Sequence, residues 1–260
     1  GFEWCVIDVN DEGELEELYQ LLANNYVEDD DRMFRFDYSK DFLNWALKPP
    51  GYLKDWHVGV RGPAKDGKPG KLLASITAVP ATVQVHGISK PMVEINFLCI
   101  HKKLREKRLS PMLIREITRR VNLTNRWQAV YTAGQMLPGC KSSCRYWHRT
   151  ISVEKLIDIR FSYLPIGKKM VDHVASLALP SEPKHKWRPM VEADIPEVTR
   201  NLNEYLNTLK LAQIFDEDEV KHLMLPKPNV MSSFVLESSE GANKVENSTI
   251  TGRITDFGSF

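Results

Sequence analysis

The residues best suited to chemistry lie between positions 94 and 111, in the sequence EINFLCIHKKLREKRLSP. An apolar stretch ends at residue 100, and a charged loop follows it. Its charged members are five cations and one anion, Lys102, Lys103, Arg105, Glu106, Lys107 and Arg108. Ser110 and Pro111 then predict the start of a helix, because a hydroxyl residue followed by proline is typical of a first turn. Free N–H groups at such a start attract anions, so this corner suits a phosphate-bearing ligand.

A basic run of this kind is also typical of a solvated turn, a nuclear-localisation signal or a nucleic-acid patch. Its position between a strand and a helix favours the phosphate ligand, since a targeting tail would lie at a disordered end. Nucleic acid is disfavoured further because 35 Lys and Arg balance 34 Asp and Glu, and no stretch interleaves aromatic and basic residues.

Acidic residues gather at positions 28–31, directly before the aromatic sequence MFRFDY. The pattern is that of a loop after a helix, and a solvated acidic loop is one interpretation. The other is a binding surface, because carboxylates beside aromatic rings attract a cationic amine or lysine side chains.

Cys140, Cys144 and His148 are spaced four residues apart, as metal ligands on one helix face would be. We reject a metal site, since Gly139 and the turn-like GCKSS argue against a continuous helix and no fourth ligand has suitable spacing. No Gly-x-Ser-x-Gly motif indicates a covalent nucleophile. We therefore expect neither a metal nor a prosthetic group.

Several elements must position these residues. Asn10 or Asp11 can cap a helix that runs to about residue 24, and Ser39 can cap a second that Pro49 and Pro50 end. Strands at 56–61, 72–79, 82–86 and 92–100 predict an antiparallel meander. A helix from Ser110 and a short strand at 129–133 follow it.

A weak internal repeat extends the plan. Residues 189–209 resemble residues 6–26, and strands at 233–237 and 253–260 repeat the order of the first hairpin. The second copy looks unfinished at Phe260, because an apolar strand with no partner leaves an open sheet edge. We therefore expect an α+β fold, duplicated, with an incomplete second copy.

Composition sets the broad class. The 260 residues carry a formal charge of +1, contain four cysteines and include no apolar run long enough to span a membrane. The start of the chain lacks the basic and apolar regions of a signal peptide. These features predict a cytoplasmic protein in a reducing compartment.

Four strings resemble the eukaryotic N-myristoyltransferase family: EINFLCIHKKLREKR, NYVEDDDRMFRFDYS at 25–39, AVYTAG at 129–134 and CRYWHR at 144–149. The resemblance runs from about Phe2 to Phe260. It implies an acyl-CoA N-acyltransferase-like mixed sheet flanked by helices and duplicated with pseudo-twofold symmetry. The expected domains are residues 1–180, with the acyl-CoA site and part of the peptide groove, and 187–260, the beginning of a second domain.

The activity that the resemblance implies is an acyl transfer. The myristoyl group of myristoyl-CoA would pass to the N-terminal glycine amine of client proteins by direct attack on the thioester. Besides these substrates we expect no nucleic-acid partner and no transmembrane segment. We expect the protein to act close to ribosomes or to membrane surfaces. In the family the base is a carboxylate at the end of the chain, so this chain alone is expected to be inactive. The alternative is a binding module that holds acyl-CoA or peptide without turnover.

The resemblance also assigns residues. Phe97 and Leu98 would supply the backbone N–H pair that holds the oxyanion, and Asn96 and Thr132 would guide the amine. The coenzyme contacts would be Phe97, Leu98, Cys99, Ile100, Arg105, Glu106, Lys107, Arg108, Leu109, Ser110 and Pro111. Glu106 departs from the family, which has a small serine there, and its carboxylate is unfavourable beside phosphate. The peptide contacts would be Tyr26, Val27, Asp29, Asp31, Phe34, Arg35, Phe36, Tyr38, Thr132, Gly134, Tyr146 and His148.

Overall fold

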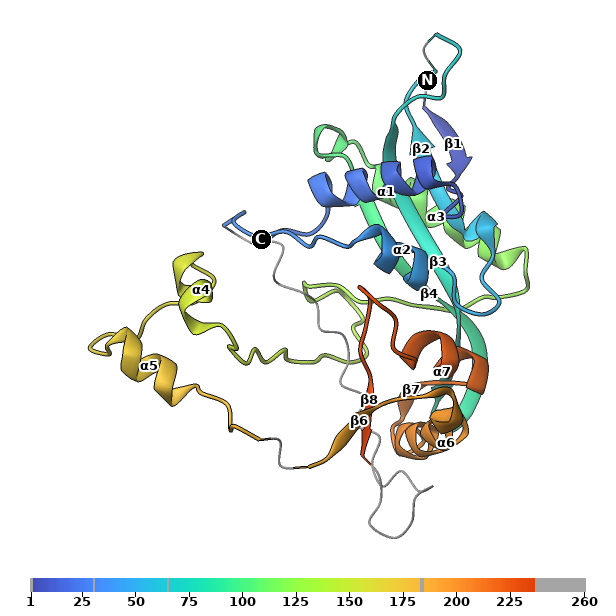
Figure 1. The fold of residues 1–260 in the computed structure, drawn as a ribbon. Helices are drawn as coiled ribbons and strands as arrows, with labels where there is room; N and C mark the ends of the chain where they lie inside the picture. The colour runs from blue at the N-terminus through green and yellow to red at the C-terminus, as the bar shows by residue number, and fades with distance from the viewer. Residues whose placement is uncertain (1, 30, 65, 183–184, 237–260) are drawn as a thin grey trace. The chain divides into compact units, whose positions relative to one another are not determined.

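The computed structural model describes residues 2–236 apart from 30, 65 and 183–184, and its fold is α+β, as predicted (Figure 1). The described residues form two units, one within 2–132 and 187–236 and one within 133–186. The site lies in the first unit. Its main sheet and flanking helices are β1 (Glu3–Val6), α1 (Glu12–Asn25), α2 (Lys40–Ala46), β2 (His57–Arg61), β3 (Leu72–Val85), β4 (Ile88–Ile100), α3 (Leu109–Asn122), β5 (Ala129–Val130) and β7 (Leu211–Ile214).

The main sheet is mixed. Its strands follow the order β1-β2-β3-β4-β5, and β7 pairs with the far end of β3. All pairs are antiparallel except β4 with β5. Because side chains alternate along a strand, the two faces of the sheet carry separate apolar cores.

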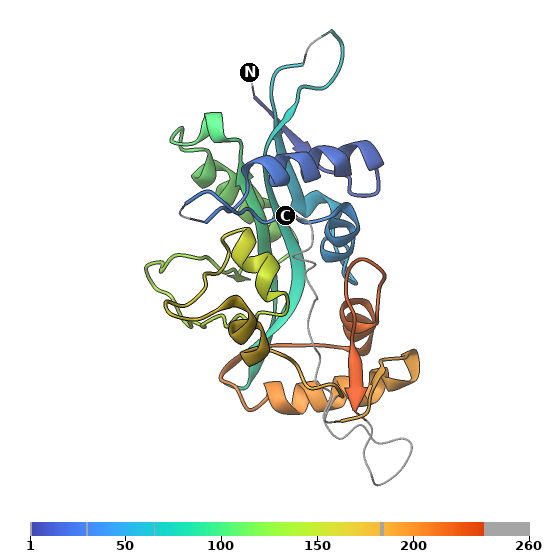
Figure 2. The same ribbon diagram turned by 60° about the vertical axis from the view of Figure 1, so that its left-hand side comes forward.

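The helices cover opposite faces of this sheet (Figure 2). On one face α1 and α2 pack through Leu18, Leu22 and Leu43 in a core that includes Phe97 and Cys99 of β4. On the other face α3 packs on a core that it shares with β2, β3 and β4. Its three buried residues there are Leu113, Ile117 and Val121. The end of β4 is thus held between two packed layers.

The strand β3 is longer than predicted. The sequence suggested a break near Pro80, but residues 72–85 form one strand in which Pro80 pairs with Val93. On its other side β3 pairs with β2 up to Thr77 and with β7 from Thr82. Pro80 lies between these ladders, where the missing N–H of proline is tolerated.

The predicted caps of the first two helices are confirmed, and that of the third is wrong. Asp11 accepts the Glu14 N–H at 2.9 Å, and Ser39 accepts the Phe42 N–H at 3.2 Å. The helix α3 begins at Leu109, and its N-cap is Arg108, with φ 56° and no side-chain cap. The left-handed backbone at Arg108 starts the helix before Ser110 can act as its cap.

After residue 186 a strand is again followed by a helix, as β1 is followed by α1. The described elements there are β6 (Trp187–Pro189), η3 (Glu192–Asp194), α6 (Ile195–Leu206), β7, α7 (Glu217–Met224) and β8 (Phe234–Leu236). β6 pairs with β8 antiparallel, and Val198, Val220 and Val235 form a small core. The predicted strand at 253–260 lies outside the described residues.

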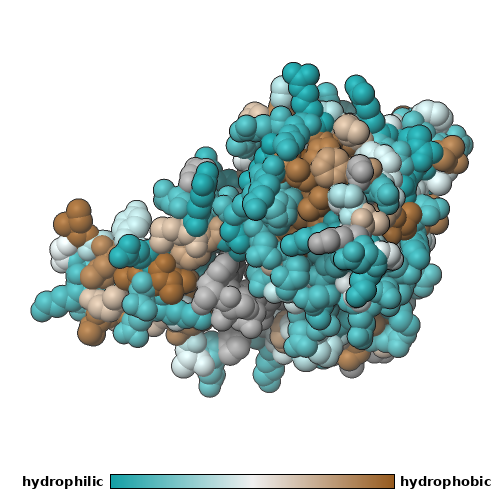
Figure 3. Space-filling view, turned by 90° about the horizontal axis from the view of Figure 1, so that it is seen from above, coloured by the Kyte–Doolittle hydropathy of each residue, from teal (hydrophilic) through white to brown (hydrophobic). Residues whose placement is uncertain are grey.

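Residues 133–186 contain the short helices α4 (Val153–Asp158) and α5 (Met170–Ser176). Many large apolar side chains of this unit are exposed, including Trp147 and Ile166. Figure 3 shows hydrophobic residues gathered on the surface of this unit. Among the described residues, no helix is long and apolar enough to cross a membrane.

Candidate active site

A bulge interrupts the pairing of β3 with β4 near the end of β4. Ser75 pairs with Cys99 and Thr77 pairs with Asn96, so Phe97 and Leu98 both lie opposite Ile76. Phe97 has φ 51°, a left-handed conformation that is uncommon for a residue with a bulky side chain. A bulge of this kind takes backbone groups out of the ladder and re-aims them. The structure therefore places a bulge at Phe97 and Leu98, the two residues whose N–H groups the family resemblance assigns to the oxyanion.

Aromatic rings surround the bulge on the α1 side. The Phe97 ring lies 5.4 Å from the Tyr38 ring, edge to face, and 6.1 Å from the Tyr26 ring. Phe36 stacks on Tyr38 at 5.8 Å. Burial raises the pKa of Tyr26 to about 12, so its hydroxyl is neutral at physiological pH. The structure thus brings three predicted peptide residues together with a predicted oxyanion residue.

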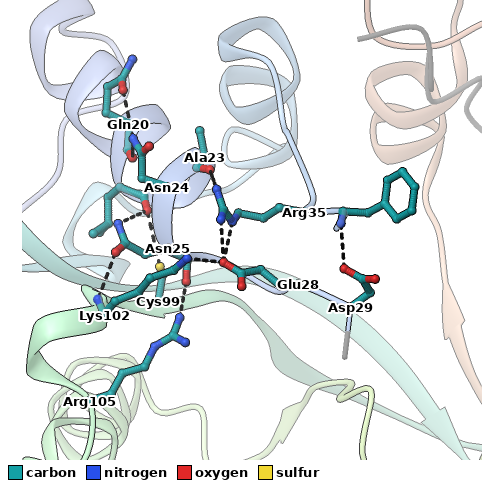
Figure 4. A network of polar contacts seen from close by, with 12 residues as sticks. Gln20, Ala23, Asn24, Asn25, Glu28, Asp29, Arg35, Cys99, Lys102 and Arg105 are labelled. Carbon is teal, nitrogen blue, oxygen red and sulfur yellow. Dashed lines mark hydrogen bonds and ion pairs between the residues drawn. The ribbon is translucent and has the colours of Figure 1, made fainter. Parts of the chain in front are cut away.

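A polar network connects the basic loop to the end of α1 (Figure 4). Asn25 is buried; its Oδ1 accepts the Lys102 N–H at 3.0 Å, and its backbone carbonyl accepts from Arg105 at 2.5 Å. The ammonium group of Lys102 pairs with Glu28, which also accepts from Arg35 at 2.6 Å. Hydrogen bonds from Lys102 and Arg35 lower the pKa of Glu28 to about 2.

This network divides the cations of the basic loop into two groups. Lys102 and Arg105 fix the loop to α1, whereas the side chains of Lys103, Lys107 and Arg108 form no ion pair within the described part of the chain. Glu106 and Arg108 both have positive φ, 68° and 56°, in a tight turn at the uncapped start of α3. Cations and free backbone N–H groups therefore meet at the start of α3, as a phosphate site requires.

The acidic loop is held largely by its own contacts. The Asp29 carboxylate accepts the Phe34 N–H at 2.7 Å, and Glu28 forms a β-bridge with Arg35. Arg35 also donates to the Ala23 carbonyl at 2.8 Å. Val27 and Phe36 are about half exposed, so apolar groups of this loop face solvent beside its carboxylates.

The residues expected to guide the amine lie on neighbouring segments: Asn96 is within β4, and Thr132 follows the end of β5. β5 pairs in parallel with β4 through Val93–Ala129 and Glu94–Val130, and this register leads toward Asn96 and Thr132. The Asn96 amide donates to Glu94 at 2.9 Å. Gly134, Tyr146 and His148 belong to the other unit, and their contribution to the site stays a prediction.

Three site residues escaped the sequence analysis. Ser75 and Thr77 are fully buried hydroxyl residues of β3 that donate to the carbonyls of Phe97 and Asn96, at 3.0 and 2.9 Å. Asn25 is the third. The signal for all of them was a polar residue within an apolar segment, LLASITAV for the first two, because a buried polar group needs a partner.

Neither a reactive thiol nor a metal cluster is found at the site among the described residues. Burial raises the pKa of the Cys99 thiol to about 12, which keeps it protonated and a poor nucleophile at neutral pH. Among the described residues, no group of three or more His, Cys, Asp and Glu side chains could hold a metal ion.

Comparison with known proteins decides the family. The model of the N-terminal domain of myristoyl-CoA:protein N-myristoyltransferase matches residues 1–144, and that of its C-terminal domain matches 158–260. The chain belongs to the N-myristoyltransferase family. Glycylpeptide N-tetradecanoyltransferase 1 of Arabidopsis thaliana is 48% identical over 260 residues, all of this chain and 57% of that protein. The Dictyostelium discoideum enzyme is 48% identical over all of this chain and 60% of its own length.

The N-myristoyltransferase fold is shared as well. A crystal structure of Saccharomyces cerevisiae N-myristoyltransferase with bound myristoyl-CoA matches with a TM-score of 0.86 and 44% identity. The match covers 94% of this chain and 58% of the yeast chain. This N-myristoyltransferase family member therefore spans somewhat more than half the length of the relatives it resembles.

Proposed function

We propose that this chain binds myristoyl-CoA and acts in the transfer of its acyl group to the N-terminal glycine amine of proteins. The observation that carries the proposal is the β4 bulge followed directly by the basic loop and the uncapped start of α3. One strand end thus supplies both a backbone N–H pair and a phosphate site. A fatty-acyl thioester of coenzyme A has the two matching parts, a reactive carbonyl and a pyrophosphate.

At the bulge, the N–H groups of Phe97 and Leu98 would hold the thioester oxygen. The amine attacks the carbonyl carbon, and the carbonyl oxygen becomes an oxyanion. The carbonyl then re-forms as the carbon–sulfur bond breaks. The attacking nitrogen gives up one proton and the coenzyme A thiolate takes up one, so the products are an amide and the free thiol. Fixed donors aimed at the developing charge lower the barrier, and each contributes ~3 kcal/mol in acyl-transfer sites. Leu98 is 37% exposed, so a substrate can approach this side of the bulge.

The start of α3 would hold the phosphates of the coenzyme. Lys103, Lys107 and Arg108 have no competing ion pair among the described residues, and Leu109, Ser110 and Pro111 form the first turn of the helix. Glu106 is exposed on the same turn and opposes phosphate binding. Lys102 and Arg105 hold the loop in position through their contacts with Asn25 and Glu28.

The peptide would lie against the aromatic and acidic loop at residues 26–38. Tyr26, Phe36 and Tyr38 provide apolar contact next to the bulge, and Asp31 is an exposed carboxylate that attracts a cationic N-terminus. Asn96 and Thr132 would orient the glycine amine, although neither is a strong base. A cytoplasmic location and proximity to ribosomes or membrane surfaces stay predictions.

The coenzyme part of the proposal is tested by charge reversal. We expect the double substitution Lys107→Glu and Arg108→Glu to weaken myristoyl-CoA binding at least ~30-fold by calorimetry, because two charge-assisted contacts are replaced by repulsion. Lys90→Glu is the matched control, since it makes the same kind of charge change at an exposed position near the opposite end of β4. Equal affinity in the wild type and the double variant would remove the phosphate site.

A further inference from the structure

The buried hydroxyls of Ser75 and Thr77 on β3 contact the backbone of the bulge, and neither takes a direct part in the proposed reaction. Thr77 and Ser75 are fully buried, and neither can touch a substrate from inside the sheet. Thr77 Oγ1 donates to the Asn96 carbonyl at 2.9 Å, and Ser75 Oγ donates to the Phe97 carbonyl at 3.0 Å. They lie on the two sides of Ile76, the single residue opposite the bulge.

These two carbonyls share their peptide units with the two N–H groups of the bulge. The Asn96 carbonyl and the Phe97 N–H belong to one planar peptide unit, and the Phe97 carbonyl and the Leu98 N–H belong to the next. In a trans peptide unit the C=O and N–H point in opposite directions. A donor fixed on the carbonyl therefore sets the direction of the N–H at the other end of the same unit. Each hydroxyl controls one member of the N–H pair.

The hydroxyls also make the two N–H groups stronger hydrogen-bond donors. Hydrogen bonds in a chain polarise one another, so a carbonyl that accepts a bond makes the N–H of its own unit a better donor. The left-handed φ of Phe97 is costly for a bulky residue and persists only where surrounding contacts hold it. The ring contacts of Phe97 with Tyr38 and Tyr26 hold its side chain, and the two hydroxyls hold its backbone.

We propose that Thr77 and Ser75 are positioning residues that aim the Phe97 and Leu98 N–H groups at the thioester oxygen, an inference that rests on the proposed function. They act through the backbone, so their loss should change the polarisation of the bound carbonyl much more than the affinity for the acyl donor. The affinity should come mainly from contacts with the coenzyme and the acyl chain, and hydroxyls that touch only backbone carbonyls would leave those contacts unchanged.

The test is infrared spectroscopy of myristoyl-CoA labelled with carbon-13 at its carbonyl, bound to the full chain. In the wild type the carbonyl band should move to lower frequency on binding. Thr77→Val, which keeps the shape and removes the hydroxyl, should lose at least half of that shift while binding within about twofold of the wild type. Thr77→Ser retains the hydroxyl and should keep the shift, and Ser75→Ala with Thr77→Val should remove most of it.

The outcomes separate the two proposals. A wild-type protein that binds myristoyl-CoA with no carbonyl shift contradicts the N–H pair itself. A wild-type shift that survives in the double variant overturns the positioning role and leaves the N–H pair standing. If Thr77→Val does not fold, the comparison of Thr77→Ser with Thr77→Ala applies, because both side chains are small and only one has a hydroxyl. Equal shifts in that pair likewise overturn the role of Thr77.

Discussion

Phe97 adopts a backbone conformation that a residue of its type rarely adopts, and its neighbours explain how it is held. Its ring lies among Tyr26, Tyr38 and the core beneath α1, and buried hydroxyls bind the peptide units on both sides of it. The sequence predicted a core strand here, and only the family resemblance pointed to the N–H pair. A bulge depends on the partner strand, so the strand that carries it contains no local sign of it.

Glu106 offers a direct test at the residue scale. It stands in the turn before α3 beside Lys107 and Arg108, where a carboxylate repels phosphate. We expect Glu106→Gln to tighten myristoyl-CoA binding by about threefold to tenfold at low salt, since one like-charge contact is removed. The gain should shrink as salt is added, because exposed charges are screened. Weaker binding in this variant would show that the carboxylate supports the loop in another way.

His57 predicts a pH dependence of stability. It is fully buried, and burial lowers its pKa to about 4 from 6.5, so the folded protein binds fewer protons there than the unfolded chain. Its contribution to stability is complete above pH 6.5 and is lost as the pH falls toward 4. The loss amounts to about 3 kcal/mol over that window.

The matched variant is His57→Phe, which keeps a flat ring next to Tyr52 and cannot titrate. Denaturant unfolding at pH 7 and pH 4.5 should show a smaller fall in the free energy of unfolding for the variant than for the wild type. Carboxylates with lowered pKa, such as Glu28 and Glu116, destabilise both proteins equally in acid. Equal falls in both proteins would mean that His57 titrates normally in the folded state.

At the scale of elements, the sequence predicted the helices well and the strands less well. Apolar spacing and the caps at Asp11 and Ser39 placed both ends of α1 and the start of α2 within about a residue, whereas α2 ends at Ala46, before the prolines that were expected to end it. β3 was divided at Pro80, because a proline ends most strands and its tolerance here depends on where β2 and β7 stop. The start of α3 was misplaced because the left-handed turn before it depends on the hydrogen bonds of Lys102 and Arg105 to Asn25.

Gly70, in the connection between β2 and β3, lies where a side chain would collide with backbone atoms. A Cβ atom at Gly70 would lie 2.0 Å from the Gly62 carbonyl oxygen and 2.7 Å from that of Pro63. These are backbone atoms that cannot rotate away. We expect Gly70→Ala to lower the free energy of unfolding by about 2–4 kcal/mol. Gly134→Ala, whose Cβ would meet nothing within 4 Å, is the stability control and should differ from the wild type by less than ~0.5 kcal/mol.

For the whole molecule, the fold class and family followed from the sequence, whereas the division into units did not. The predicted domains at 1–180 and 187–260 stay a prediction. The structure groups 187–236 with 1–132 because β7 pairs with β3, and Trp45 and His222 exchange hydrogen bonds with each other's backbone carbonyls. Pairing between such distant segments depends on long-range contacts that no local pattern reveals.

The central claim is that the bulge of β4 holds the thioester oxygen of myristoyl-CoA. The most direct measurement is a crystal structure of the chain with a ketone analogue of myristoyl-CoA, in which a methylene group between sulfur and carbonyl prevents acyl transfer. We predict that the ketone oxygen lies within about 3 Å of the backbone nitrogens of both Phe97 and Leu98, with the pyrophosphate at the start of α3. A ketone oxygen bound elsewhere, with both N–H groups facing other partners, would contradict the account.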